Sequence, residues 1–197
     1  MNVLGCILAG GRSSRFGSDK AMALLDGKTL LDHAIARLAP QVDQVTINTN
    51  SADVFFKRSG LPVVPDLSPS YDGPLAGVLA ALTWAEAHGF AFVVSVAVDT
   101  PGFPLNLVQA FEPQQPSIIK VAQSPSGLHP TFGLWPADTR PKLAEWLSKG
   151  GSKKMLAFLE SQTFRPVIFD LAPNGADPFF NINLKDDLFN RLAKNAG

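Results

Sequence analysis

The sequence has little cysteine and no excess of charge of either sign. Its 197 residues include one cysteine, and 17 basic residues balance 17 acidic ones. A single cysteine excludes a disulfide within the chain, and Cys6 lies in an apolar run with no adjacent histidine or cation to activate a thiol. We therefore interpret Cys6 as a small core residue of a cytoplasmic protein. The balanced charge predicts no general affinity for nucleic acid, so any anion site must be local.

Long apolar runs and two familiar phosphate-binding patterns are also missing. The first apolar run stops at Gly10-Gly11, too early for a membrane span, and no basic segment with a cleavable apolar stretch opens the chain. We therefore expect no membrane partner. The spacing GxGxxG does not occur, and Ser18-Asp19 stands where a P-loop would need lysine followed by serine or threonine. These two absences argue against the common dinucleotide and Walker-type nucleotide sites.

The stretch from residue 3 to residue 20 nevertheless has the composition of a phosphate site. An apolar run at residues 3–9, short enough for a buried strand, leads into Gly10-Gly11 and then into a loop rich in serine and basic residues, among them Arg15 and Lys20. Glycines let backbone N–H groups turn toward an anion, and the cations neutralise it. The alternative is an ordinary connection with solvated basic residues. We favour a phosphate site because several kinds of phosphate ligand coincide at one strand end.

A second candidate site follows the apolar run at residues 90–97. This run predicts a strand that is buried on both faces, and Asp99-Thr100-Pro101 comes directly after it. Ligands of open α/β sheets bind outside the carboxyl ends of the strands, so Asp99 should lie near the glycine loop. Mg²⁺ needs only one or two protein carboxylates when phosphate oxygens complete its shell, so Asp99 is a candidate metal ligand. The alternative is that Asp99 caps a helix starting near Pro104.

Alternating strand and helix patterns predict a single-domain, doubly wound α/β fold with a mostly parallel sheet and helices on both faces. Thr29 can cap a helix over residues 30–38, and Pro74 can begin a helix that stops at Gly89. Other helices are expected over about residues 52–58 and 137–148, from a Ser152 cap to residue 159, and over 186–193. Further strands are expected at residues 45–48, 62–65, 118–122, 131–135 and 167–169.

Three more polar residues are weaker candidates. Asn48 and Asp66 follow expected strands, where each can read the N–H groups of a purine edge, hold a ribose hydroxyl, or simply end a turn. His129 precedes Pro130 in what we predict to be a turn, and is the histidine best placed for a site. No order of serine, histidine and aspartate suggests covalent catalysis, and none is needed if the attacking group is an ionised phosphate.

The first of these blocks resembles the LAGGxxxRxGxxK signature of nucleotidyltransferases, with Leu8-Ala9-Gly10-Gly11, Arg15, Gly17 and Lys20 at its fixed positions. The whole set of blocks, from residue 7 to residue 188, resembles the molybdenum cofactor guanylyltransferases. Residues flanking two blocks, Ser95 to Val98 and Leu184-Lys185, depart from the usual family pattern. The later blocks that carry the resemblance are Asn48, Pro65-Asp66, Gly73-Pro74-Leu75-Ala76-Gly77, Asp99-Thr100-Pro101, His129-Pro130, Leu134-Trp135, Phe180-Asn181-Ile182-Asn183 and Asp187-Leu188.

This resemblance implies a Rossmann-like nucleotidyltransferase that moves GMP from GTP to molybdopterin with Mg²⁺, and that has molybdoenzyme maturation proteins as potential partners. It implies a nucleotide-binding half at about residues 1–105 and an acceptor-binding half at about 106–197. The implied roles are catalysis for Arg15, Lys20 and Asp99; nucleotide binding for Leu8, Ala9, Gly10, Gly11, Lys20, Asn48, Asp66 and Asp99; Mg²⁺ binding for Asp99; and acceptor binding for His129, Asn181 and Asn183.

Three alternatives stay open at this level. The chain can be a cytidylyltransferase for the same pterin, a sugar-phosphate nucleotidyltransferase, or a non-catalytic carrier of GTP or of the cofactor. The joint presence of Arg15, Lys20 and Asp99 favours catalysis, because a carrier has no need of a carboxylate that holds a metal.

Overall fold

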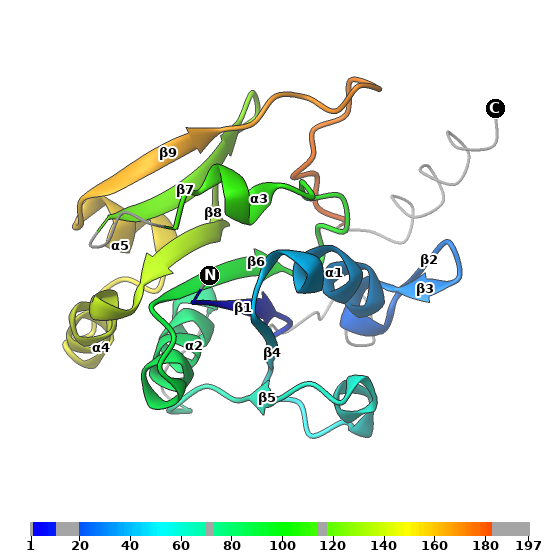
Figure 1. Ribbon diagram of the computed structural model, residues 1–197. Helices are drawn as coiled ribbons and strands as arrows, with labels where there is room; N and C mark the ends of the chain where they lie inside the picture. Colours follow the sequence, from blue (N-terminus) through cyan, green and yellow to red (C-terminus); the bar gives the residue numbers. More distant parts are fainter. Residues whose placement is uncertain (1, 11–19, 70–72, 114–117, 183–197) are drawn as a thin grey trace.

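A seven-stranded mixed sheet forms the centre of the protein (Figure 1). The computed structural model describes residues 2–10, 20–69, 73–113 and 118–182. Across the sheet the strands are ordered β5-β4-β1-β6-β8-β7-β9, and two further short strands, β2 and β3, pair separately. The strands are β1 (Val3–Leu8), β2 (Leu24–Leu25), β3 (Lys28–Thr29), β4 (Gln44–Asn48), β5 (Val63–Val64), β6 (Phe92–Ala97), β7 (Ile119–Ser124), β8 (Gly127–Pro136) and β9 (Phe164–Ile168).

Strand β8 is the one strand of the large sheet that runs against its neighbours, among the described residues. It pairs antiparallel with β6 and β7, whereas the β1–β4, β1–β6, β4–β5 and β7–β9 pairs are parallel. The prediction of a mostly parallel sheet is therefore confirmed. Because β8 is reversed, its first residues lie at the same edge of the sheet as the carboxyl ends of all the other strands.

Helices cover both faces of the sheet, as the alternating pattern predicted. One apolar cluster packs α1 and α3 on one face, and a second packs α2, α4 and α5 on the other. The α-helices are α1 (Leu30–Leu38), α2 (Pro74–His88), α3 (Leu107–Ala110), α4 (Arg140–Ser148) and α5 (Met155–Glu160). The 3₁₀ helices are η1 (Lys20–Met22), η2 (Ala39–Gln41), η3 (Val54–Ser59) and η4 (Ala137–Thr139).

The first strand shows how the sequence divides between the two faces. Val3 and Ile7 belong to the cluster around α1, whereas Leu4 and Cys6 belong to the cluster around α2, as expected for side chains that alternate along a strand. Gly5 lies between them, and a Cβ at this position would lie 2.8 Å from Leu38 Cδ2. The glycine therefore allows α1 to pack closely against β1.

Several predicted helix boundaries are confirmed, and others are wrong. Thr29 caps α1 in a capping box, and α2 begins at Pro74 and ends before Gly89. The helix expected over about residues 52–58 is the 3₁₀ helix η3. Helix α5 has Lys154, not Ser152, at its N-cap, and the Ser152 hydroxyl accepts a hydrogen bond from the Lys154 N–H in the approach to the helix. The helix expected at residues 186–193 lies outside the described residues.

The predicted turn at His129-Pro130 is wrong, because both residues lie in β8. The chain reverses earlier, between Ser124 and Gly127, which are paired. The pairing then slips: Ala122 lies opposite His129, but the preceding Val121 lies opposite Gly133. Pro130 thus falls in an irregular part of the ladder, where a residue without an N–H group is tolerated.

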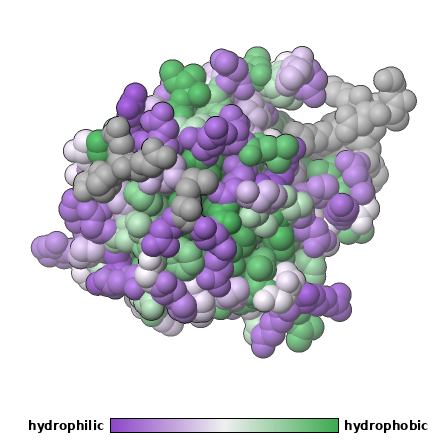
Figure 2. Space-filling view, in the orientation of Figure 1, coloured by the Kyte–Doolittle hydropathy of each residue, from purple (hydrophilic) through white to green (hydrophobic). Residues whose placement is uncertain are grey.

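Apolar side chains lie mostly in these two clusters. Figure 2 shows hydrophilic residues over much of the face in view, with hydrophobic residues interspersed among them. No helix in the described part of the chain is long and apolar enough to cross a membrane.

The contact between α2 and the end of β4 is unusually close. Asn48 is 4% exposed, and Gly77 of α2 packs directly against it. A Cβ at Gly77 would lie 2.2 Å from Asn48 Oδ1 and 2.8 Å from Leu8 Cδ2. Packing therefore requires a glycine at this fourth position of α2, although glycine is unfavourable within a helix.

We expect Gly77→Ala to destabilise the protein. In a free helix position this change adds about 1 kcal/mol of stability, but here the new methyl group clashes with Asn48. Overpacking of this kind costs about 1–3 kcal/mol, so the free energy of unfolding in urea should fall by a similar amount.

Two controls isolate the contact between Gly77 and Asn48. Ala87→Gly, at an exposed position of the same helix, measures the ordinary cost of a glycine there. In an Asn48→Ala background, the Gly77→Ala change should cost less, because the clashing amide is gone. A more stable Gly77→Ala protein would show that the packing does not resist the methyl group.

Candidate active site

The carboxyl edge of the sheet brings together the candidate residues that the structure describes. Gly10 follows β1, Asn48 ends β4, Asp66 follows β5, and Asp99 follows β6. His129 joins them from β8, because that strand is reversed. Among the other candidates, Gly11, Arg15 and Asn183 lie outside the described residues.

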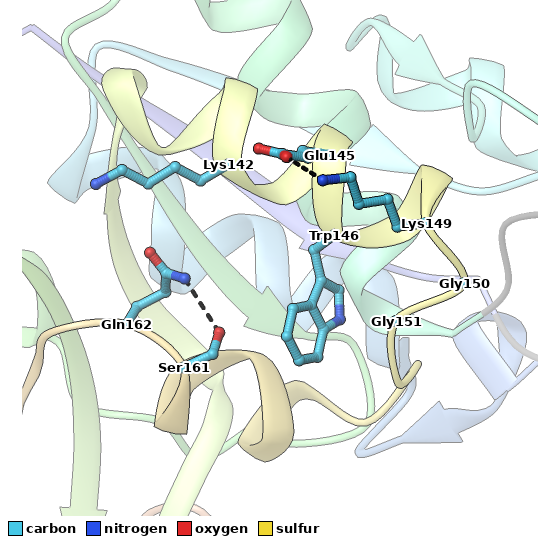
Figure 3. A pocket seen from close by; sticks show the side chains of 8 residues that line it. All are labelled: Lys142, Glu145, Trp146, Lys149, Gly150, Gly151, Ser161 and Gln162. Carbon is cyan, nitrogen blue, oxygen red and sulfur yellow. Dashed lines mark hydrogen bonds and ion pairs between the residues drawn. The ribbon is translucent and has the colours of Figure 1, made fainter.

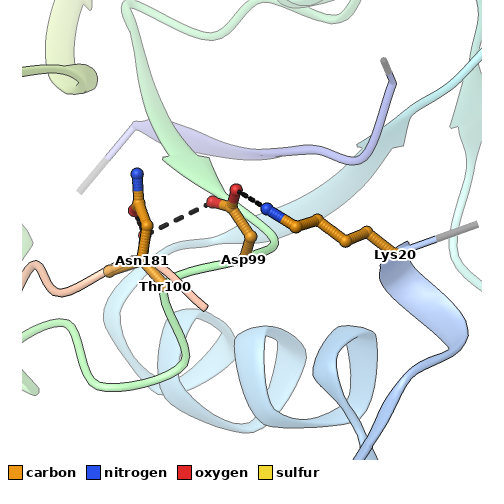
Figure 4. Close-up of polar contacts among 4 residues, drawn as sticks. All are labelled: Lys20, Asp99, Thr100 and Asn181. Carbon is orange, nitrogen blue, oxygen red and sulfur yellow. Dashed lines mark hydrogen bonds and ion pairs between the residues drawn. The ribbon is translucent and has the colours of Figure 1, made fainter. Parts of the chain in front are cut away.

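An ion pair lies at the centre of this edge (Figure 4). Lys20 Nζ, at the start of η1, lies 2.7 Å from Asp99 Oδ2, and the two side chains are 18% and 22% exposed. The alternative that Asp99 caps a helix is wrong, because α3 begins at Leu107 after the N-cap Asn106. The sequence signature and the strand-end carboxylate, predicted separately, thus meet in space.

The end of the described chain packs against the same turn. The Thr100 hydroxyl donates a hydrogen bond to Asn181 Oδ1, and the Ile182 N–H donates to the Asp99 carbonyl over 2.8 Å. Ile182 is fully buried, while Asn181 stays exposed. Nδ2 of Asn181 has no partner within the described residues and points away from Thr100 in Figure 4. Asn181 therefore braces the turn with its oxygen, and the described residues offer no partner to its N–H₂ group.

Asn48 and Asp66 form one network with a residue that the sequence reading missed. Asn48 Nδ2 donates to one oxygen of Asp66 over 2.9 Å and to the Val64 carbonyl over 3.0 Å. Asn50 Nδ2 donates to the other Asp66 oxygen over 2.7 Å, and the Asp66 N–H donates back to Asn50 Oδ1. The two amides fix the plane of a half-buried carboxylate. The sequence did not mark Asn50 as a site residue, because its hydrogen-bond partner Asp66 lies 16 positions further along the chain.

The first residues of the glycine loop are already hydrogen-bonded to neighbouring strands. The Ala9 N–H donates to the Asn48 carbonyl over 2.9 Å, and the Leu8 carbonyl accepts from the Val98 N–H over 3.2 Å. Leu8 and Ala9 are buried, and Gly10 is the first exposed residue after the strand. Leu8 and Ala9 thus set the position from which the loop starts.

His129 lies in a second polar cluster at this edge, with Ser124 and Asp177. Ser124 Oγ lies 2.7 Å from His129 Nε2 and 2.6 Å from Asp177 Oδ2. Burial lowers the pKa of His129 from its ordinary 6.5, and the charge of Asp177 only partly opposes this. Burial acts to raise the pKa of Asp177, but hydrogen bonds from Ser124, Ser126 and the Phe179 N–H lower it below 3.8. Neither Ser124 nor Asp177 was a candidate from the sequence.

The donors at this edge fit one divalent cation shared with phosphate oxygens. The carboxylate of Asp99 lies beside Lys20 at the carboxyl end of β6, and a hard cation prefers such oxygen ligands. In the described residues, no three His, Cys, Asp or Glu side chains group together as a metal site. Within this part of the chain, the carboxylate of Asp99 could hold a metal only together with ligands from elsewhere, such as phosphate oxygens.

Cys6 plays no part in this chemistry. It is buried in β1, and burial raises the pKa of its thiol to about 12. A thiol with this pKa carries almost no thiolate near neutral pH. The interpretation of Cys6 as a core residue is confirmed.

A separate pocket of about 460 Å³ lies between α4 and the residues after α5 (Figure 3). Its lining includes Lys142 and Trp146 of α4 and Gln162 after α5. None of the candidate residues from the sequence contributes to it. We assign the active site to the carboxyl edge because the charged pair and the sequence signature meet there.

Comparison with known proteins identifies the class of protein and then its family. A family model described as a MobA-like NTP transferase domain matches residues 5–164, so the protein is a nucleotidyltransferase. The chain belongs to the family of molybdenum cofactor guanylyltransferases, since it is 40% identical over 193 residues to the molybdenum cofactor guanylyltransferase of Rhizobium johnstonii. That match covers 95% of this chain and 90% of the relative.

Solved structures show that this fold serves more than one substrate. Molybdopterin-guanine dinucleotide biosynthesis protein A from Archaeoglobus fulgidus has a TM-score of 0.74 at 21% identity, over 98% of this chain and 99% of its own. The 4-diphosphocytidyl-2C-methyl-D-erythritol synthase from Anaerococcus prevotii also has a TM-score of 0.74, at 9% identity, over 99% and 96% of the two chains. The fold alone therefore does not choose the substrate.

The His129 cluster predicts a loss of stability on acidification. Below pH 6.5 the unfolded chain binds a proton at His129 that the folded protein resists, so stability is full above this pH and falls toward the lowered pKa. A second loss follows below pH 3.8, because the unfolded chain then binds a proton at Asp177 that the folded protein resists down to the lowered pKa. His129→Gln should flatten the first decline in urea unfolding measured against pH.

Two variants test this assignment. Asp177→Asn should remove the second decline, and His88→Gln changes an exposed histidine outside the cluster as a control. If His129→Gln keeps the parent's slope below pH 6.5, another group is responsible for the first decline.

Proposed function

We propose that this protein transfers GMP from GTP to the terminal phosphate of molybdopterin and releases pyrophosphate. The observation that carries the proposal is the Lys20–Asp99 ion pair at the carboxyl edge, in a chain of this family. It joins a cation of the phosphate signature to a carboxylate able to hold a metal, which are the two charges that phosphoryl transfer needs.

In the reaction, an oxygen of the acceptor phosphate attacks the α-phosphorus of GTP. The new P–O bond forms as the bond to the β-phosphate oxygen breaks, and pyrophosphate leaves with the electron pair. Lys20 and Arg15 stabilise the negative charge that grows on the leaving group. A divalent cation, for which we propose Mg²⁺, would bind Asp99 and supply further charge stabilisation.

Substrate binding then has to change the partners of the ion pair. In the free protein, Lys20 and Asp99 neutralise each other at 2.7 Å. With GTP bound, we propose that Lys20 turns to the phosphate oxygens while Asp99 takes the cation. The site stays close to electrically balanced in both states, which lowers the cost of holding charges in a half-buried position.

Asp66 gives a chemical reason for guanine. Its carboxylate is held by Asn48 and Asn50, and its remaining lone pairs can accept two N–H groups side by side. Guanine presents a ring N–H next to an amino group, whereas cytosine presents one amino group beside an acceptor nitrogen. We propose that Asp66 reads the base, that Asn48 positions Asp66, and that Gly10 and Gly11 bind the triphosphate.

The acceptor is assigned to the second half of the chain. We propose that the nucleotide-binding half covers about residues 1–105 and the acceptor-binding half about 106–197. His129, Asn181 and Asn183 are the proposed acceptor contacts. Nδ2 of Asn181, which has no partner among the described residues, supports this for one of them. A cytoplasmic location and contact with molybdoenzyme maturation proteins belong to the same proposal.

GTP with Mg²⁺ should raise the melting temperature more than CTP with Mg²⁺. A ligand that binds only the folded state at a hundred times its Kd adds about 2.7 kcal/mol, which a melting curve resolves. Asp66→Asn should narrow the difference between the two nucleotides, because an amide offers only one acceptor atom. Equal or larger stabilisation by CTP would favour the cytidylyl alternative.

Asp99→Asn should fold normally and lose at least about a hundredfold to a thousandfold of its rate of GMP transfer. The amide keeps the shape of the side chain but carries no charge for a metal. Product formation from GTP and molybdopterin is measured across a Mg²⁺ titration, with circular dichroism as the test of folding. Glu160→Gln, at the exposed end of α5, is the matched control. Near-parent turnover by folded Asp99→Asn would reject the metal role.

A further inference from the structure

His129 is held by more hydrogen bonds and packing contacts than a histidine needs merely to bind a ligand. Ser124, at the end of β7, is 4% exposed and lies between His129 Nε2 and Asp177 Oδ2. The three residues come from two strands and from the segment after β9. Their convergence at the acceptor side of the carboxyl edge calls for an explanation beyond the packing of a hairpin.

The hydrogen bonds of this cluster determine where the protons lie. A carboxylate only accepts, so the one hydroxyl proton of Ser124 points to Asp177 at 2.6 Å. The 2.7 Å contact between Ser124 Oγ and His129 Nε2 then requires the proton to sit on Nε2. The neutral imidazole is thereby held in its Nε2–H tautomer. Its other nitrogen, Nδ1, carries a lone pair and has no partner among the described residues.

Packing holds the ring in place as well. His129 stacks on Phe179 with ring centroids 4.5 Å apart and an interplanar angle of 25°. Phe179 is buried, and its own N–H donates to Asp177 Oδ1 over 2.8 Å. One carboxylate thus binds both the serine that fixes the tautomer and the backbone of the residue beneath the ring.

We propose that Ser124 and Asp177 are positioning residues that present Nδ1 of His129 as a hydrogen-bond acceptor to an N–H group of the acceptor substrate. A reduced pterin carries ring N–H groups and an amino group, whereas a phosphate dianion offers only acceptors. The cluster therefore recognises the heterocycle of the acceptor and not its phosphate. This inference rests on the proposed function, because it takes the pterin as the acceptor.

Asp177→Asn separates positioning from simple packing. The asparagine amide can donate to Ser124, so the hydroxyl proton of Ser124 is free to turn to His129 Nε2. The histidine proton then moves to Nδ1, which becomes a donor facing the substrate. The volume and fold of the cluster stay nearly the same, while its hydrogen-bond polarity is reversed.

The first measurement is the tautomer itself, read from ¹⁵N shifts of the histidine rings in long-range ¹H–¹⁵N spectra. The chain has three histidines, and the signals that disappear in His129→Gln identify His129. The parent protein should show Nε2–H, and Asp177→Asn should shift the population toward Nδ1–H. Ser124→Ala, which removes the hydroxyl altogether, should give a mixture of both tautomers. A parent protein with the proton on Nδ1 would overturn the proposal without any assay of activity.

The second measurement is steady-state transfer of GMP to molybdopterin. Asp177→Asn and Ser124→Ala should each raise the KM for molybdopterin by roughly fivefold to tenfold, the value of about one hydrogen bond, and leave the GTP-induced melting shift unchanged. Glu160→Gln, at the exposed end of α5, should behave as the parent in both assays. Parent-like KM values in both folded variants would overturn the proposal, whereas a parent protein that forms no product from GTP would overturn the proposed function instead.

Discussion

The Lys20–Asp99 ion pair is the interaction on which the candidate site depends. Its two members come from the start of η1 and from the turn after β6, and 79 positions of sequence separate them. The pair joins these two segments of the chain. It also neutralises two opposite charges that are each largely removed from water, with the Lys20 and Asp99 side chains 18% and 22% exposed. The ion pair keeps both side chains in place until the phosphates and the cation replace each as the other's partner.

Hydrogen bonds from the last described residues stabilise the turn that carries Asp99. Thr100 and Asn181 share a hydrogen bond, and the Ile182 N–H binds the Asp99 carbonyl. Asn181 therefore cannot be altered without affecting the residue next to the proposed metal ligand. A substitution of Asn181 would change both the turn beside the proposed metal ligand and the proposed contact with the acceptor. The roles of its oxygen and of its N–H₂ group therefore have to be considered separately.

Much of the site could be predicted from the sequence, because strand ends are local features. Apolar runs followed by Gly10 or Asp99 indicated both the strands and the edge at which they meet. Side chains whose partners are remote in sequence gave no such signal. Ser124 is 53 positions from Asp177, and no sequence pattern around either residue predicts their contact. The buried Lys120 is similar, since Nζ binds the carbonyls of Phe111 and Glu112 at the end of α3.

The two outer strands of the sheet affect how copies of the protein behave toward one another. Strand β5 has two residues, and β9 has Pro166 at its centre. An open sheet edge normally offers a row of N–H and C=O groups to any passing strand. Here one row is too short to hold a partner in register, and the other is interrupted by a residue without an N–H group. The protein can thus keep Ile168 75% exposed on β9 with little risk that the sheet extends from one molecule into the next.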